Sequence, residues 1–450
     1  MKVSAYILTI VLILLLSNAV YAQKSWTLND CIAYALEHNL QLNDFKYNTA
    51  SDKETYRQTV RDLLPRIRGV ADYSIRFGRS VDPNDNSISN TQFFSNNYSL
   101  ESSLDLFQGF QKINAIRASK LIYNATKEEA LQQKYLLAFS IMEAYYDILF
   151  FEGALRIAED QLEISKTNYA LVKKQIDLGL VAGADIYEAE SLLLADELSL
   201  VQVNNQLIAA KLALIQQMNL EESTDIKLTP EKAQLNEVEG KIASVDSIYS
   251  EAQRFLPLIK AGKLRVEAAQ KQLAVERGRL SPSLSIFGGY GSGYFETIVD
   301  STGNTVPFRD QFRDNTFQFV GVELVIPISG GWSARSRIKQ QKIARLRAKN
   351  NLEVQKQELF QTIQSLVQEN NALKIEFEQT LKNREAQNQS FLVAQKRYEK
   401  GIINAIELFT AKNLFATAQN QHLQVSLRLE VNNANLDFYS GLPVFNISSN

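Results

Sequence analysis

The chain has 450 residues, which is long enough for two or three ordinary domains, and its formal net charge is −2. Acidic and basic residues are interspersed along it, so its charge gives no indication of a nucleic-acid partner. The single cysteine, Cys31, cannot form an intramolecular disulfide, and we expect it to be a buried, inert thiol.

The first 22 residues have the pattern of a secretory signal peptide. Lys2 supplies a positive charge, residues 7–16 are apolar apart from Thr9, and residues 20–22 suit a cleavage site. This short apolar run cannot span a bilayer of about 30 Å as a helix, which disfavours the alternative of an N-terminal anchor. Beyond residue 22 we expect no membrane-spanning helix, because no unbroken apolar stretch reaches about 18 residues. The protein is therefore expected to be exported, and either soluble or inserted in a membrane as β-structure.

The sequence repeats itself at a constant offset. "LGLVAGADIYEA" at 178–189 is similar to "KGIINAIELFTA" at 400–411, and "YSLESSLDLFQGF" at 98–110 pairs with "VGVELVIPISGGW" at 320–332. The offset is the same in both cases, since 401 − 179 = 222 and 331 − 109 = 222. We therefore predict two tandem repeats, residues 23–246 and 247–450, each with the order helix, strand, loop, strand, very long helix, tight turn, helix.

Two very long helices dominate the prediction, at residues 111–177 and 333–400. The first contains no proline and one glycine, Gly153, and apolar residues recur in it at helical spacing. About 67 residues at 1.5 Å per residue make a helix roughly 100 Å long. Shorter helices are expected at residues 28–63, 185–220 and 405–438. Two half-length helices placed end to end match one long helix, which favours a cylinder of helices.

Four strands are predicted, at about residues 67–78, 93–107, 284–295 and 315–328. Their alternation of apolar and polar residues predicts one face of each kind. Four strands of this length suit an outer membrane but cannot close a barrel alone, so closure needs two chains (eight strands) or three (twelve). A soluble antiparallel sheet packed on helices is the alternative. The glycine-rich "GGYGSG" at 288–293 is interpreted as a closely packed or bent strand rather than a nucleotide site.

Catalytic and metal-binding motifs are missing from the sequence. One cysteine and two histidines, His38 and His422, provide no recognisable ligand spacing, and no G-x-S-x-G, H-E-x-x-H or phosphate-loop pattern occurs. We therefore predict no enzymatic activity, no metal and no cofactor. A structural coiled coil remains an alternative for the long helices. However, heptads are not sustained, and the apolar positions spread over more than one face, as in a helix between two neighbours of a curved wall.

Together these features resemble the TolC-type outer membrane efflux proteins over nearly the whole mature chain. The resemblance rests on the repeated plan, on "LDLFQGF" and "IPISGGW" where strands lead into helices at Gly109, Gly330 and Gly331, and on the turns "GLVAGAD" and "YEKGIINAIEL". It implies a mixed α and β fold. Three protomers would each give four strands to a transmembrane β-barrel of twelve strands, joined to a long α-helical barrel in the periplasm. Residues 221–246 and the C-terminal tail would form an equatorial belt.

The resemblance also implies an exit duct for small toxic molecules in the outer membrane of a Gram-negative bacterium. Its implied partners are a periplasmic adaptor protein and an inner-membrane transporter of the RND or ABC type, with outer membrane lipid around the barrel. A type I protein-secretion outlet of the same fold is one alternative, and a periplasmic coiled-coil scaffold is an alternative from another class.

Roles for the tip turns follow from the same resemblance. The turns carry Gly179, Gly183, Gly401 and Ile403. Asp185 and Tyr398 would form a hydrogen-bonded latch between the two helix pairs, and Glu407 would line the pore constriction. Thr410 stands where a second acidic residue is usual, Ile403 where an arginine makes another link, and Ala184 lacks the hydroxyl that this arginine would meet. One carboxylate ring and one latch are therefore expected. From the residues alone, Glu407 and Asp185 could instead be acids that stabilise helix starts.

Overall fold

The computed structural model describes residues 25–81, 88–179, 182–221, 225–229, 244–445 and 447. The predicted signal peptide lies outside the described residues, as does most of the predicted equatorial segment 221–246. The chain forms two compact units, here called the helical unit (Met1–Lys46, Glu129–Pro257 and Lys356–Asn450) and the sheet unit (Tyr47–Glu128 and Leu258–Gln355). Each unit combines segments from both halves of the sequence.

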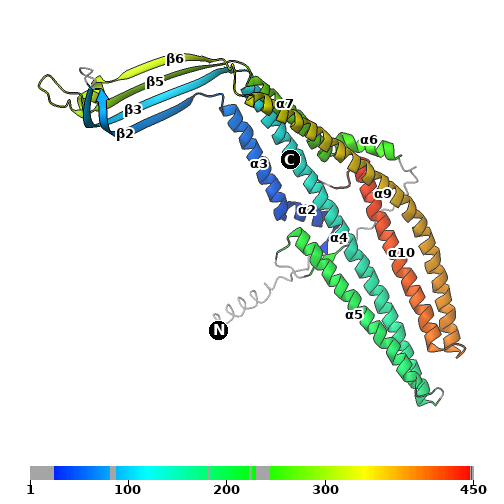
Figure 1. The fold of residues 1–450 in the computed structure, drawn as a ribbon. Coiled ribbons are helices and arrows are strands. Elements are labelled where there is room, and N and C mark those ends of the chain that lie inside the picture. The colour runs from blue at the N-terminus through cyan, green and yellow to red at the C-terminus, as the bar shows by residue number, and fades with distance from the viewer. Residues whose placement is uncertain are drawn as a thin grey trace, which may run out of the picture. The chain divides into compact units, whose positions relative to one another are not determined.

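The element order of the first half recurs in the second (Figure 1). The first half contains α2 (Leu28–His38), α3 (Leu40–Arg61), β2 (Arg66–Val81), β3 (Ile88–Gln108), α4 (Gln111–Asp177) and α5 (Asp185–Met218). The second contains α6 (Val245–Phe255), α7 (Pro257–Gly278), β5 (Ser283–Phe295), α8 (Phe308–Asp314), β6 (Phe317–Val325), α9 (Ser333–Glu399) and α10 (Ala405–Tyr439). Both α4 and α9 have 67 residues.

The first predicted helix, at 28–63, is two helices. Asn39 has an extended backbone with φ −67° and ψ 119°, which ends α2. Its side-chain oxygen accepts hydrogen bonds from the backbone N–H groups of Gln41 and Leu42, at 2.9 and 3.2 Å, and so caps α3. The second half breaks at the same place, between α6 and α7, because Pro257 cannot continue the preceding helix. The prediction of one continuous helix was therefore wrong.

The core of the helical unit lies between its helices. Ile141 and Ile148 of α4 are fully buried, as are Leu214 and Met218 of α5. Cys31 is also fully buried, as expected of an inert thiol.

Two short contacts add segments from distant parts of the sequence to the helical unit. The two-residue strands β1 (Ser25–Trp26) and β4 (Lys227–Leu228) pair in parallel. The Tyr145 hydroxyl donates a hydrogen bond of 2.7 Å to the carbonyl oxygen of Thr229. The residues before α2 and those after α5 are therefore tied together.

An open antiparallel sheet in the order β2-β3-β5-β6 forms the sheet unit. Paired residues share a face and successive residues alternate, so the register separates two faces. One face, here called the apolar face, carries exposed Ile67, Tyr73, Ile75, Phe77, Leu100, Tyr290, Val320, Val322 and Leu324. The other, here called the polar face, carries Arg66, Arg68, Asp72, Arg76, Ser99, Glu101 and Glu323.

The glycine-rich stretch is confirmed as a closely packed strand. A Cβ on Gly289 would lie 2.7 Å from the ring of Phe319, and one on Gly291 would lie 2.5 Å from the ring of Phe317. Gly321, on β6, makes the same kind of room for Phe287, at 2.5 Å. The glycines of both strands therefore let aromatic rings lie flat on the polar face.

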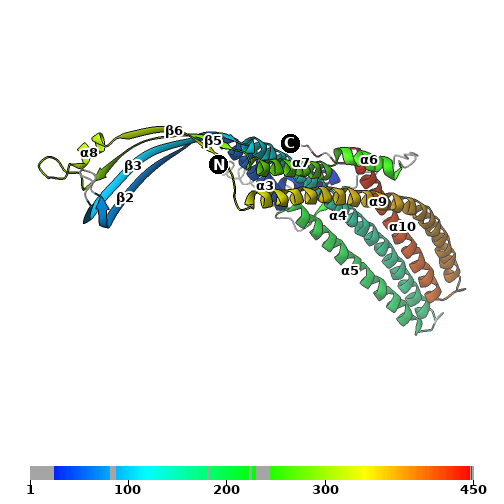
Figure 2. The same ribbon diagram turned by 45° about the horizontal axis from the view of Figure 1, so that its top comes forward.

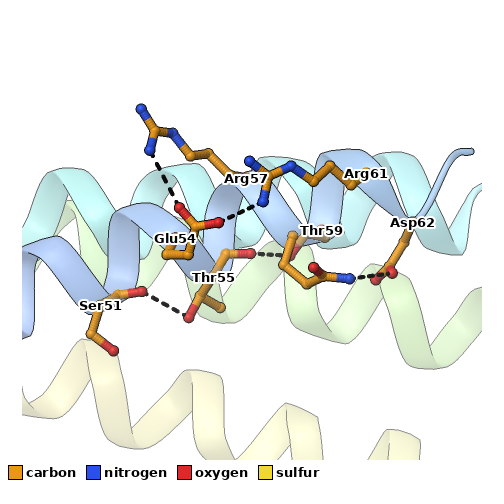
Figure 3. Close-up of polar contacts among 8 residues, drawn as sticks. Ser51, Glu54, Thr55, Arg57, Thr59, Arg61 and Asp62 are labelled. Atoms are coloured by element: carbon orange, nitrogen blue, oxygen red, sulfur yellow. Dashed lines mark hydrogen bonds and ion pairs between the residues drawn. The ribbon is translucent and has the colours of Figure 1, made fainter.

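The exposed surface of α3 is held by local polar contacts (Figure 3). Arg57 and Arg61 donate to the Glu54 carboxylate at 3.3 and 2.5 Å, and these hydrogen bonds lower the pKa of Glu54. The Thr55 hydroxyl donates to the carbonyl oxygen of Ser51 at 3.0 Å. The Glu54–Arg57 and Ser51–Thr55 contacts, three and four residues apart, have the spacing that supports a helix with a polar outer surface.

Candidate functional site

The two helix hairpins of the helical unit, α4–α5 and α9–α10, lie with their turns at the same end (Figures 1 and 2). Gly179 and Gly401, which end α4 and α9, have the same φ of +69°. The N–H of each donates at 2.8 Å to the carbonyl oxygen three residues earlier, Ile176 or Tyr398. This left-handed backbone is strained for any residue with a side chain, which explains glycine at both positions. Gly183 has open space around it.

The two turns differ in how the following helix begins. Asn404 caps α10, because its side-chain oxygen accepts a hydrogen bond of 2.9 Å from the N–H of Glu407. Ala184 occupies the cap position of α5 and provides no side-chain hydrogen bond. The first turn thus lacks a contact that the second one has.

The predicted constriction residues, Glu407 and Thr410, are exposed and lie three positions apart on α10, so they share a face. The Thr410 hydroxyl donates back to the carbonyl oxygen of Ile406 at 2.8 Å. Asp185 is exposed in the first turn of α5, as Glu407 is in the first turn of α10. Both acids are therefore placed to stabilise the helix dipole, which fits the simpler of the two sequence-based explanations.

Tyr398 is half-buried on α9 and faces the first hairpin. Burial raises the pKa of its hydroxyl, a hydrogen bond with Asn168 of α4 lowers it, and the charges of Glu188 and Asp185 raise it further. Within the described part of the chain no hydrogen bond joins Tyr398 to Asp185. Tyr398 and Asp185 therefore lie near each other, whereas the resemblance implied a direct hydrogen bond between them. Ile403 lies half-buried in the second turn.

A buried ion pair that sequence reasoning missed joins the two hairpins. Lys412 of α10 is 2% exposed, and its ammonium group donates to the carboxylate of Asp196 on α5. It also donates to the Ser165 hydroxyl of α4 at 2.8 Å and lies 4.7 Å from the centre of the Phe409 ring. Burial lowers the pKa of Lys412, while the hydrogen bond and charge of Asp196 raise it. We call Lys412, Asp196 and Ser165 the buried charge cluster.

The sequence does carry a signal for this cluster. Lys412 stands four residues after Leu408 and three before Phe415, so a charged side chain interrupts the apolar side of α10. Asp196 likewise follows the apolar run "LLLA". A charge on an apolar helix face predicts an opposite charge facing it, although sequence alone does not identify the partner.

A cavity of about 470 Å³ lies beside the buried charge cluster. It is lined by α4, α9 and α10, including Asp160, Glu163, Tyr398 and Glu399. Its described lining carries acidic residues and no basic ones, so it suits a neutral or basic partner.

The strand-to-helix corners repeat the same backbone in the sheet unit. Gly109 and Gly331 both have φ +57°, and Phe110 and Trp332 follow at +61° and +64°. The surroundings of the corners differ, however. A Cβ on Gly109 would lie 2.3 Å from the carbonyl oxygen of Gly278, whereas Gly331 has nothing within 4 Å. Gly330 is open except for the Ser333 hydroxyl at 3.5 Å.

The comparison with protein families agrees with this arrangement of strands, long helices and paired turns. The model of the family described as "Outer membrane efflux protein" matches residues 31–220 and 248–442. The chain belongs to the outer membrane efflux protein family. It is an efflux channel protein of the outer membrane of a Gram-negative bacterium, and this family is a transport family, not an enzyme family.

Individual relatives of this efflux protein point the same way. It is 25% identical to the outer membrane protein TolC of Vibrio cholerae serotype O1 over 348 residues, which cover 75% of this chain and 72% of that protein. It is 23% identical to the outer membrane efflux protein BepC of Brucella suis biovar 1 over 344 residues, 76% of this chain and 70% of that protein.

Solved structures share the fold of the efflux protein. The CusC structure superposes with a TM-score of 0.78 and 18% identity, covering 94% of this chain and 96% of that one. The CmeC outer membrane channel of Campylobacter jejuni has a TM-score of 0.79 and 14% identity, covering 94% and 87% of the two chains. The mixed α and β fold expected from the sequence is therefore confirmed.

One helix of the efflux protein differs from the expectation that none could span a membrane. By length and composition α5 is apolar enough to do so, although only 17% of its apolar window is buried within the chain. Its exposed apolar residues follow helical spacing, at Leu194, Leu198, Val201, Ile208 and Leu212. We call these five residues the α5 stripe.

Proposed function

We propose that three copies of this efflux protein form one continuous channel. Their sheets would close a transmembrane β-barrel of twelve strands, and their helices would form a periplasmic tunnel that is closed at the hairpin turns. The two-faced sheet is the observation that carries this proposal. Lipid around the apolar face and water inside against the polar face satisfy both sets of side chains. The opposite orientation would expose Arg66, Arg68 and Asp72 to lipid, which is costly.

The open edges of the sheet support closure by other copies. In the part of the chain that the structure describes, β2 and β6 each have one edge without a neighbouring strand, and unpaired backbone groups in a bilayer cost several kcal/mol each. The repeat predicts how these edges meet. Leu100 pairs with Tyr290 inside the chain. The repeat maps Leu100 onto Val322 (100 + 222 = 322), and the first strand of each half, aligned by Pro65 and Pro282, is offset by 217 and matches Tyr290 with Tyr73 (290 − 217 = 73). Val322 of one copy would therefore pair with Tyr73 of the next.

The corner at Gly331 supports the same arrangement. Gly109 has no side chain because the α7–β5 corner of the same chain lies against it. Gly331 has the same backbone conformation, and the space beside it is open. The matching α3–β2 corner of the next copy could occupy that space. In a closed ring, the corner at Gly331 would meet a neighbouring corner just as the corner at Gly109 does within the chain. Both positions would then require glycine in the left-handed conformation.

The α5 stripe supports side-by-side packing of the helices in the ring. Its five apolar residues are 48–58% exposed in one chain. Spacings of four, three, seven and four residues place them on one side of α5. A helix of the next copy would cover this stripe, so the apolar composition of α5 serves packing between copies.

We further propose that the hairpin turns gate the tunnel. Three copies of Glu407 facing one axis would favour cations over anions in a narrow pore. Tyr398 and Asp185 would help to hold the hairpins together at the turn. Tyr398 has a hydrogen bond with Asn168 of α4 and lies near Asp185 and Glu188 of α5. The buried charge cluster would fasten α10 to α4 and α5 further along the hairpins, in a chain whose turn carries Ile403 where the resemblance implies an arginine link.

The transported substrates are proposed to be small toxic molecules delivered by an inner-membrane transporter of the RND or ABC type. A periplasmic adaptor would contact the acidic cavity beside α4, α9 and α10, where its basic side chains would be attracted to Asp160, Glu163 and Glu399. Exported proteins are the alternative substrate.

A pair of cysteines tests the ring. In a Tyr73→Cys plus Val322→Cys variant, oxidation should link each copy to the next and give covalent trimers on a non-reducing gel, because directly paired strand residues have Cβ atoms about 4.5–5.5 Å apart. The control is Asp72→Cys plus Val322→Cys, which moves one cysteine to the opposite face and should not cross-link. Covalent species of two copies only would rule out the trimer. A soluble protein that gives neither membrane fraction nor bilayer conductance would contradict the channel itself.

A further inference from the structure

The connection between β5 and β6 contains a helix where a polar loop was expected. In Figure 2, α8 lies at the end of the sheet away from α3 and α7. Its aromatic rings pack against Tyr98 and Tyr294, which stand on the apolar face. The centre of the Tyr98 ring lies 5.6 Å from that of Phe312, and the Tyr294 ring lies 5.8 Å from Phe308. The helix therefore packs on the apolar face of the sheet and not on its polar face.

Hydrogen bonds fix α8 in this position. The Ser292 hydroxyl, on the apolar face, donates to the carbonyl oxygen of Phe312 at 2.5 Å. Gln311 is 2% exposed, and its amide accepts from the N–H of Phe295 at 3.0 Å and donates to the carbonyl oxygen of Val306 at 2.8 Å. Because a buried amide with several partners is costly to move, α8 is a built part of the sheet unit.

The outer surface of α8 combines exposed aromatic rings with balanced charge. Phe308 is 45% exposed and Phe312 41% exposed, although both rings already contact tyrosines. The helix has two arginines and two aspartates, and Arg313 pairs with Asp314 at 2.7 Å and with Asp310 at 3.6 Å. A partner attracted by net charge is therefore disfavoured. The boundary between lipid headgroups and acyl chains suits such a surface, because it accommodates aromatic rings and solvated charges together.

We propose that α8 is a membrane-surface anchor, with Phe308 and Phe312 inserted at the headgroup boundary of the outer leaflet. This inference rests on the proposed barrel, because the apolar face contacts lipid only if the sheet spans the membrane. The anchor would fix the height of the barrel in the bilayer and would shield the part of the apolar face around Tyr98 and Tyr294 from water.

Single cysteines carrying an environment-sensitive fluorophore test this proposal in full-length protein in phospholipid vesicles. The three positions are Phe312→Cys on α8, Phe317→Cys on the polar face, and Tyr290→Cys at mid-strand on the apolar face. Phe317 is the matched control, because it is the same residue type, five positions away, and 47% exposed against 41% for Phe312. Cys31 is fully buried and should not react. The probes are lipids with a nitroxide on the acyl chain and aqueous iodide.

The expected result is quenching by nitroxide lipid at 312 and 290, and by iodide at 317. If 290 is quenched by lipid but 312 only by iodide, α8 stands in water and the anchor is wrong while the barrel survives. If neither quencher reaches 312, protein covers α8 and the lipid assignment is wrong. If iodide alone quenches 290, the sheet does not lie in the membrane and the proposed channel fails as well.

Discussion

The two helix hairpins have almost the same backbone and different side-chain chemistry. Their long helices are equal in length, and Gly179 and Gly401 have the same φ. The second hairpin has a side-chain cap at Asn404 and contributes Lys412, whereas the first has no side-chain cap at Ala184 and contributes Asp196. The repeated backbone determines where the turns lie. The side chains that differ between the repeats determine the contacts between the two hairpins. The Lys412–Asp196 ion pair thus joins the second hairpin to the first. Two identical hairpins could not form it, because each hairpin contributes only one of the two charges.

The largest effect is expected from breaking the buried charge cluster. Lys412→Met leaves the Asp196 carboxylate buried without its cation, and removing one partner of a buried ion pair costs about 3–5 kcal/mol. The variant should unfold at lower denaturant concentration and conduct more in planar bilayers. Lys396→Met, at an exposed lysine of α9, is the control and should change neither. Adding Asp196→Leu to Lys412→Met should restore stability but not closure; restored closure would show that packing alone holds the hairpins together.

A smaller effect, on ion selectivity, is expected to differ between the acidic residues of the two turns. Glu407→Gln removes three charges from the proposed constriction, so the cation preference measured from the reversal potential in a salt gradient should fall. Asp185→Asn, at the exposed acid that begins α5 in the first hairpin, should leave the reversal potential nearly unchanged. Equal effects of the two substitutions would mean that both turns face the pore alike.

A change in conductance without a change in selectivity is expected from the tip latch. Tyr398→Phe and Asp185→Ala should each raise single-channel conductance, because each removes a polar group between the hairpins. Asn168→Ala should have the same effect as Tyr398→Phe, since Asn168 contacts the Tyr398 hydroxyl. Unchanged conductance in all three variants would remove the latch assignment.

The smallest effect concerns the helix caps. Asn404→Ala should destabilise the first turn of α10 by about 1 kcal/mol, and Ala184→Ser should stabilise the first turn of α5 by a similar amount. Hydrogen exchange of the amides at Glu407 and Tyr187, each three residues after its cap, reports each change separately. If Ala184→Ser gives no added protection, the first turn is held by contacts other than its cap.

Most of the secondary structure was predictable, because long helical periodicity and strand alternation are strong local signals. The helix predicted at 111–177 coincides with α4, and that at 333–400 with α9 to within one residue. The break at Asn39 was missed because asparagine is compatible with a helix and ends one only through its local hydrogen bonds. The strand predicted at 315–328 is β6, which ends at Val325 because Pro327 lacks a ladder donor.

The candidate site was less predictable than the fold. Turn glycines can be found from sequence because a positive φ is a property of the backbone alone. The partners of Tyr398 and Lys412 depend on how two hairpins far apart in sequence pack, and no local pattern records that. The helix α8 was missed for a related reason, because the contacts that fix it include those of Gln311 with Phe295 of β5 and of Phe312 with Tyr98 of β3.

The open edges of β2 and β6 also bear on how the protein is made. A single protomer that enters a bilayer brings two rows of unpaired backbone groups with it, so insertion is unfavourable before its neighbours arrive. In the proposed trimer, assembly and insertion would therefore form one concerted event, whose yield would depend on protomer concentration. Before assembly the same edges would be templates for aggregation, so the proposed trimer would have to form faster than mispairing and proteolysis remove its protomers.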